Sequence, residues 1–142
     1  MRTSDYGDGP RVPGSFGGTR PIDYAGHVPD GPDPMSMSHA VLCGVIERRA
    51  DELGILWTHL PDTARRIAHR GFPDYVLSGP FGTMFREVKT TGEQPDTDQR
   101  TWGWMLRAGG EDYAIWEPKD LPTERIYREL RRIATGNSDP TP

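Results

Sequence analysis

The first regular pattern along the chain lies between residues 38 and 54, where apolar residues recur three and four positions apart. That spacing places them on one face of a helix, with charged residues on the other face and Gly54 as a stop signal. The apolar positions are Val41, Leu42, Val45, Ile46, Ala50 and Leu53. We therefore predict an amphipathic helix over residues 38–54, followed by a short first strand over residues 55–60.

Two runs rich in β-branched and aromatic residues, 75–77 and 84–88, predict a β-hairpin. They flank the sequence Gly79-Pro80-Phe81-Gly82, in which the fixed φ of proline suits the second position of a tight turn. A turn centred between Pro80 and Phe81 places Asp74 directly opposite Glu87, with Cβ atoms about 4.5–5.5 Å apart. Side chains alternate along a strand, so Lys89 shares a face with Glu87 while Val88 turns away.

The remaining patterns predict a helix from residue 97 to about residue 108, a strand over 113–116 and a last helix over 123–134. In the first of these helices, Trp102, Met105 and Leu106 have the spacing of a buried face. The last helix combines an apolar face with a basic face that we expect to be solvated, formed by Arg125, Arg128, Arg131 and Arg132. Together the elements predict a compact α/β domain with a mixed central β-sheet flanked by helices.

Composition sets the limits of this domain. Hydrophobic residues make up only 34% of the chain, and 17 Gly and 14 Pro concentrate outside the periodic segments, which indicates that part of the chain does not fold. We predict a disordered Gly/Pro-rich tail over residues 1–35, one domain over 36–135 and a short disordered tail over 136–142. The formal net charge is −4, so any affinity for nucleic acid must come from local basic patches and a bound metal.

Cys43 is the only cysteine, which excludes an intrachain disulfide and a cysteine-rich zinc site. We expect it to be a small buried residue of the first helix. No signal sequence and no apolar run long enough for a membrane span is present, so we expect a soluble cytoplasmic protein without membrane contact.

The opposed carboxylates of Asp74 and Glu87 are the strongest chemical signal in the sequence. Like charges this close repel each other, and a shared divalent cation removes the repulsion. Oxygen ligands favour Mg²⁺ or Mn²⁺. With the Lys89 ammonium on the same face, the arrangement suits phosphoryl transfer: carboxylates for the metal and a cation for the attacking water or the developing charge.

The same residues match a known family. Pro73-Asp74, Glu87-Val88-Lys89 and Gln99 resemble the PD-(D/E)XK nuclease superfamily. The order of GFPD, EVKT, Gln99 with Trp102, and Trp116-Glu117-Pro118 is similar to that of small stand-alone VRR-NUC domains, which are common in phages.

This resemblance implies a restriction-endonuclease-like fold and a metal-dependent DNA endonuclease, located in the host cytoplasm if phage-encoded. It implies that Asp74, Glu87 and the Val88 carbonyl bind Mg²⁺ or Mn²⁺, and that Lys89 and Gln99 complete the catalytic set. It further implies branched or flapped DNA, such as Holliday junctions, as substrate in replication, repair or recombination, and a homodimer as a frequent assembly.

Basic residues near these motifs are candidates for contacts with the nucleic-acid backbone. The segment from Pro61 to Arg70 leads directly into the Asp74 strand. We expect the nucleic-acid-binding residues to be Arg65, Arg66, Arg70, Arg86 and Arg100.

Three alternatives stay open at this stage. Gln99 has the spacing of a capping box with Asp96, which is a purely structural role. The family places an acidic residue on the first helix, where this chain has Ser38 or His39, so the upstream metal contact falls to His39 or Glu47. Finally, the same fold could serve as a non-catalytic DNA-binding or assembly module, or the hairpin could belong to a small scaffold protein.

Overall fold

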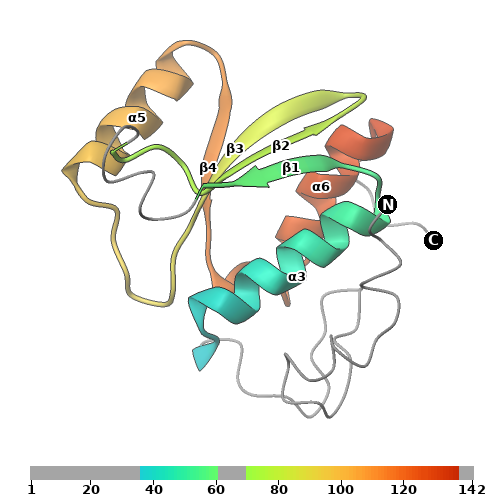
Figure 1. The fold of residues 1–142 in the computed structure, drawn as a ribbon, viewed down its shortest axis with the longest axis horizontal. Helices are drawn as coiled ribbons and strands as arrows, with labels where there is room; N and C mark the ends of the chain where they lie inside the picture. Colours follow the sequence, from blue (N-terminus) through green and yellow to red (C-terminus); the bar gives the residue numbers. More distant parts are fainter. Residues whose placement is uncertain (1–35, 61–69, 138–142) are drawn as a thin grey trace.

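A computed structural model of the chain describes residues 36–60 and 70–137. Within them a helix, three strands, a second helix, a fourth strand and a third helix follow one another, with a short 3-10 helix, η2 (Pro118–Asp120), before the last helix (Figure 1). This is the order predicted from the hydrophobic pattern. The segment 1–35 and residues 138–142, predicted as tails, lie outside the described residues.

The four strands form one mixed sheet in the order β1-β2-β3-β4. Their bounds are β1 Leu56–His59, β2 Tyr75–Gly79, β3 Gly82–Val88 and β4 Asp112–Trp116. The pairs β1/β2 and β2/β3 are antiparallel, whereas β3 and β4 are parallel. Because a parallel pair needs a crossover connection, the chain leaves the sheet after β3 and returns through helix α5, Thr97–Ala108.

The hairpin between β2 and β3 has the predicted register. Tyr75 pairs with Arg86 and Gly79 pairs with Gly82, so Pro80 and Phe81 form the turn. The turn end of the hairpin packs closely on helix α6, Arg125–Thr135. A Cβ on Gly79 would lie 2.3 Å from the Ile133 carbonyl oxygen, so this approach requires glycine.

Helices α3 (His39–Glu52) and α6 lie side by side on one face of the sheet, and the main core fills the space between them (Figure 1). Helix α3 begins at Ser38, whose side chain accepts a hydrogen bond from the Val41 N–H, as expected for an N-cap. Cys43 is buried, as predicted. The core includes Leu42, Val45, Ile46, Ala50, Tyr75, Leu77, Met84, Val88, Trp116, Ile126, Leu130 and Ile133.

Helix α5 covers the opposite face of the sheet, and its contact differs from the prediction. Its only buried residue is Gly103, which faces the Tyr113 ring of β4. Trp102 and Met105 were predicted to be buried, but they are 36% and 58% exposed. Only a residue without a side chain fits against Tyr113, so the helix lies close to the sheet at this point. Trp102 packs against Phe72, with 4.9 Å between the ring centroids, and its Nε1 donates to the Arg70 carbonyl.

None of the helices within residues 36–60 and 70–137 is both long enough and apolar enough to cross a membrane.

Candidate functional site

The proposed carboxylate pair lies at the end of the β2/β3 hairpin that is remote from the turn. Asp74 directly precedes β2, and Glu87 is the last but one residue of β3. Continuing the observed register by one residue places the two opposite each other, as the sequence predicted. Both side chains are almost completely buried, at 1% exposure. Two carboxylates in such a position require compensation by hydrogen bonds or cations.

Part of that compensation for Asp74 comes from the backbone. Its Oδ2 accepts a hydrogen bond of 2.8 Å from the Val88 N–H. The N–H and C=O of one strand residue point to the same side, so the Val88 carbonyl also faces the side of Asp74. The two carboxylates and this carbonyl, the three predicted metal ligands, therefore belong to one end of the hairpin.

Lys89 and Gln99 meet at the other carboxylate. The Lys89 Nζ lies 3.2 Å from Glu87 Oε2 and donates to Gln99 Oε1 at 2.9 Å. Gln99 closes the triangle, because its Nε2 donates to the same Glu87 oxygen at 2.8 Å. The structure thus brings together these three residues from β3, the loop after it and the first turn of α5.

Gln99 also has the structural role left open by its spacing. Its Oε1 accepts from the Asp96 N–H at 2.9 Å, and its own N–H donates to Asp96 Oδ1 at 2.8 Å, which is a complete capping box. One amide oxygen therefore serves the helix start and Lys89 at once. The capping role of Gln99 is confirmed, and its side chain also points towards Lys89; its catalytic role stays a prediction.

His39 approaches the same site from the first turn of α3. Its Nε2 lies 3.9 Å from Asp74 Oδ2, and its Nδ1 lies 3.6 Å from the Cys43 sulfur. The interaction with Asp74, followed by that with Cys43, raises the pKa of His39 to about 10, so the ring is protonated at neutral pH. In this state it offsets the negative charge of Asp74. The same ring, once deprotonated, is a nitrogen ligand.

Glu47, the other candidate for the upstream position, has different partners. Its Oε1 accepts a 2.6 Å hydrogen bond from the Tyr75 hydroxyl and lies 3.2 Å from His59 Nδ1. The rings of His59 and Tyr75 stack with 4.3 Å between their centroids. Of the two candidates on α3, His39 is the one placed beside Asp74.

The sequence argument missed the role of Tyr75, which it gave only as a strand residue. Its ring is completely buried, and burial raises the pKa of its hydroxyl far above the ordinary value, so the hydroxyl remains a hydrogen-bond donor. Glu47 is 28 residues away along the chain, and no local spacing connects the two. The alternation of strand residues marks Tyr75 as inward-facing, but it cannot identify the partner.

The donor set is compatible with a hard cation. Residues 36–60 and 70–137 contain no group of three or more His, Cys, Asp or Glu side chains arranged to hold a metal ion. The predicted set instead uses two carboxylates and one backbone carbonyl, all of them oxygen donors of the kind that Mg²⁺ and Mn²⁺ accept. Mg²⁺ commonly keeps several waters beside one or two carboxylates, so a set this small still fits it.

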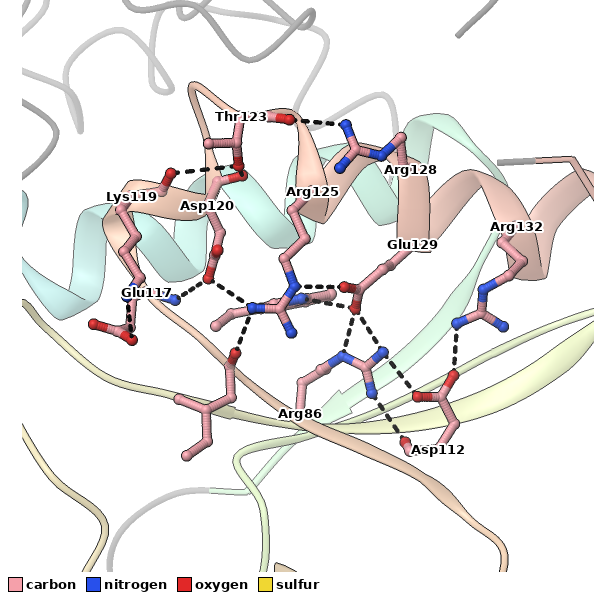
Figure 2. A network of polar contacts seen from close by, with 12 residues as sticks. Arg86, Asp112, Glu117, Lys119, Asp120, Thr123, Arg125, Arg128, Glu129 and Arg132 are labelled. Atoms are coloured by element: carbon pink, nitrogen blue, oxygen red, sulfur yellow. Dashed lines mark hydrogen bonds and ion pairs between the residues drawn. The ribbon is translucent and has the colours of Figure 1, made fainter. Parts of the chain in front are cut away.

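Arg86 was predicted to contact nucleic acid, and the structure corrects this. Its side chain is buried, at 1% exposure, between the sheet and α6 (Figure 2). Its Nη2 lies 2.6 Å from Glu129 Oε1 and 3.0 Å from Asp112 Oδ1. A guanidinium enclosed in this way cannot reach a phosphate in solution.

The ion-pair network around Arg86 also includes part of the basic face of α6, which was expected to be solvated. Arg125 pairs with Glu129 at 2.7 Å, and Arg132 pairs with Asp112 at 2.6 Å (Figure 2). Burial opposes ionisation of both acids, but the charges and hydrogen bonds of these arginines hold the pKa values of Glu129 and Asp112 below their ordinary range. The network therefore joins β3, β4 and α6 by charge.

The other predicted nucleic-acid contacts have different outcomes. Arg65 and Arg66 lie outside the described residues. Arg70 is exposed, and its Nε lies 3.7 Å from Asp98 Oδ2 of α5. Arg100 is exposed on α5, where it directly follows Gln99. Of the five arginines, Arg70 and Arg100 are thus the two that the structure places on the surface.

Comparison of the chain with models of known protein families, with curated proteins and with solved structures found no match.

Proposed function

We propose that this chain is a metal-dependent DNA endonuclease with a restriction-endonuclease-like fold, related to the VRR-NUC domains that its motifs resemble. The observation that carries the proposal is the triangle of Glu87, Lys89 and Gln99 beside the opposed carboxylate of Asp74. An ammonium held against one buried carboxylate, with a second buried carboxylate opposite it in the hairpin register, is suited to hydrolysis of a phosphodiester.

Asp74, Glu87 and the Val88 carbonyl would hold Mg²⁺ or Mn²⁺, with His39 as the candidate fourth group. When bound, the cation would lower the pKa of a water molecule and neutralise charge on the phosphate. The chain's own residues do the rest. Glu87 and Gln99 fix the Lys89 Nζ in one position, from which it can orient the attacking water and stabilise the negative charge that develops on the phosphate.

In the overall reaction, the water oxygen forms a bond to phosphorus while one phosphorus–oxygen bond of the DNA backbone breaks. The leaving oxygen takes up a proton, and the products are a phosphate monoester and a hydroxyl. Branched or flapped DNA is the proposed substrate. A homodimer is the proposed assembly for binding it.

The test is cleavage of labelled duplex, flap and four-way-junction DNA in the presence of Mg²⁺, Mn²⁺ or EDTA. We expect metal-dependent cutting that falls by at least about 100-fold in Asp74→Asn, which removes a proposed metal ligand, and in Lys89→Met, which removes the cation proposed to act at the reacting phosphate. Glu111→Gln is the matched control, since this exposed acid precedes β4 at the end of the sheet remote from Val88 and Lys89. Unfolding midpoints of all variants separate loss of chemistry from loss of fold.

Cutting that persists in EDTA, or in both site variants, would contradict the proposal. Junction binding without cutting, unchanged in both site variants, would favour the alternative of a non-catalytic DNA-binding module.

A further inference from the structure

Helix α5 carries an exposed surface that the proposed chemistry does not use. Trp104 is 66% exposed, which is unusual for so large an apolar side chain. Arg100 precedes it by four residues and Arg107 follows it by three, so all three lie on one face of the helix. We call these three residues the α5 stripe.

The stripe is positively charged. Within the part of the chain that the structure describes, neither Arg100 nor Arg107 forms an ion pair with an acidic side chain. The Arg100 guanidinium donates to the Pro95 carbonyl and the Thr97 hydroxyl, and the Arg107 guanidinium lies over the Tyr113 ring at 4.9 Å from its centroid. Neutral groups thus hold both cations in place without cancelling their charge.

The neighbours of the stripe do not change this picture. The helix positions nearest to it around the helix axis are Thr97, Gly103 and Ala108, none of which is charged, and the carboxylate of the N-cap Asp96 accepts from the Gln99 N–H. Asp98, the acid of this helix, lies on another side, where it approaches Arg70. The stripe is therefore a local basic and aromatic surface on a chain of net charge −4.

The stripe begins one residue after Gln99 of the proposed active site. Arg100 directly follows Gln99, whose side chain contacts Glu87 and Lys89. With a rise of about 1.5 Å per residue, Arg107 lies about 10 Å further along the helix than Arg100, away from the edge of that site. A nucleic-acid strand that leaves the site along α5 passes over all three side chains.

We propose that the α5 stripe binds a single-stranded DNA segment next to the scissile phosphate, with Trp104 stacking on an unpaired base and both arginines contacting phosphates. An indole can stack only on a base whose face is open, which duplex DNA does not offer along its length, whereas stacking combined with backbone cations is the usual mode for single strands. The inference rests on the proposed nuclease function for the position of the scissile phosphate, and it assigns a single-stranded arm to the substrate.

Binding is measured in EDTA, so that it is independent of cleavage, by fluorescence anisotropy of a labelled oligothymidine of about 15 nucleotides, within the length that single-strand sites cover. We expect Trp104→Ala to raise the Kd about 5- to 100-fold. Arg100→Gln and Arg107→Gln should each reduce the slope of log K against log salt concentration by about 0.7, which is the effect of losing one phosphate contact on a single strand.

Phe81→Ala is the matched control, because Phe81 is a 62% exposed aromatic residue at the turn end of the hairpin, away from the carboxylates. It should leave the Kd unchanged. Unchanged binding in Trp104→Ala would overturn the inference, as would an equal loss of affinity for blunt duplex DNA. A change in the oligomeric state of the DNA-free protein in Trp104→Ala would also overturn it, by showing that the surface joins two copies of the chain.

The two proposals can fail separately. If cleavage is observed but Trp104→Ala binds single strands normally, the inference alone fails. If no DNA is cut but the stripe variants lose binding as expected, the stripe stands and the nuclease proposal fails.

Discussion

Gln99 shows how one side chain can link a helix start to a reactive group. Its amide oxygen accepts from the Asp96 N–H and from Lys89, while its amide nitrogen donates to Glu87. The helix cap thereby fixes the rotamer that holds the ammonium. Helix stability and the position of Lys89 are coupled through a single residue, and variants can separate the two effects.

Gln99→Ala removes both functions. We expect the free energy of unfolding to fall by about 1 kcal/mol, the usual cost of a lost cap. DNA cleavage should fall by about 10- to 100-fold, because a group that orients a reactive residue is lost. Denaturant unfolding and single-turnover cleavage measure the two effects.

Asp96→Ala is the control for this experiment, since it removes the cap that Asp96 provides but leaves the contacts of the Gln99 amide with Glu87 and Lys89. It should show a similar loss of stability with cleavage close to that of the wild type. Equal loss of cleavage in both variants would show that Gln99 acts only as a cap.

Among the elements, α5 has the position that matters most, because its first turn delivers Gln99 to the end of β3. One close contact at this position is between Gly103 and Tyr113. A Cβ at residue 103 would lie 2.7 Å from the tyrosine ring, which is well inside van der Waals contact. The helix can approach the sheet this closely because residue 103 has no side chain.

Gly103→Ala should destabilise the protein by about 1–3 kcal/mol through overpacking, even though alanine favours helices by about 1 kcal/mol over glycine. Displacement of α5 should also lower cleavage, because Gln99 moves with the helix. Thr101→Ala, an exposed change on the same helix, should stay within about 0.5 kcal/mol of the wild type. A more stable Gly103→Ala variant would show that α5 is not held by this contact.

For the molecule as a whole, the buried network of Arg86, Glu129 and Asp112 connects the sheet to α6 (Figure 2). The folded-state pKa values of both acids lie below their ordinary range. Unfolded carboxyls titrate near pH 4, at about 4.3 for Glu and 3.9 for Asp. A depressed folded-state pKa means that the network contributes its full stability above the unfolded values, and that this contribution is lost as the pH falls through the folded values.

We therefore expect the free energy of unfolding to decrease steadily below about pH 5. Glu129→Gln should remove about 3 kcal/mol at pH 7, because it leaves buried Arg86 without its closest countercharge, and it should flatten the decrease at low pH. Urea unfolding at several pH values measures both. Glu111→Ala, at an exposed acid, is the control and should follow the wild-type curve. An unchanged pH dependence in Glu129→Gln would show that other groups control acid unfolding.

Short-range patterns in the sequence were sufficient for the order of elements, the ends of α3 and α5, and the hairpin register. Periodicity, caps and turn residues act over a few positions, so they place Asp74 opposite Glu87 and Lys89 on the same face as Glu87. The opposed pair and its neighbouring lysine followed from the turn alone. Apart from His39, the residues proposed for the chemistry therefore all lie in the segment between Asp74 and Gln99, where local patterns can be interpreted.

Only the tertiary structure determined the contacts between residues that are far apart in the sequence. Arg86 lies on the same face of β3 as Met84 and Val88, which the alternation of strand residues predicts. Its burial as a charged residue, however, depends on Glu129, which is 43 residues away along the chain. Likewise, Trp102 has the spacing of a buried residue, but it packs against Phe72 and donates to the Arg70 carbonyl, so it remains 36% exposed. Countercharges and packing partners of this kind come from distant segments. A local pattern predicts on which face of a helix or strand a side chain lies, but only the packing of the whole chain determines which residues contact that face.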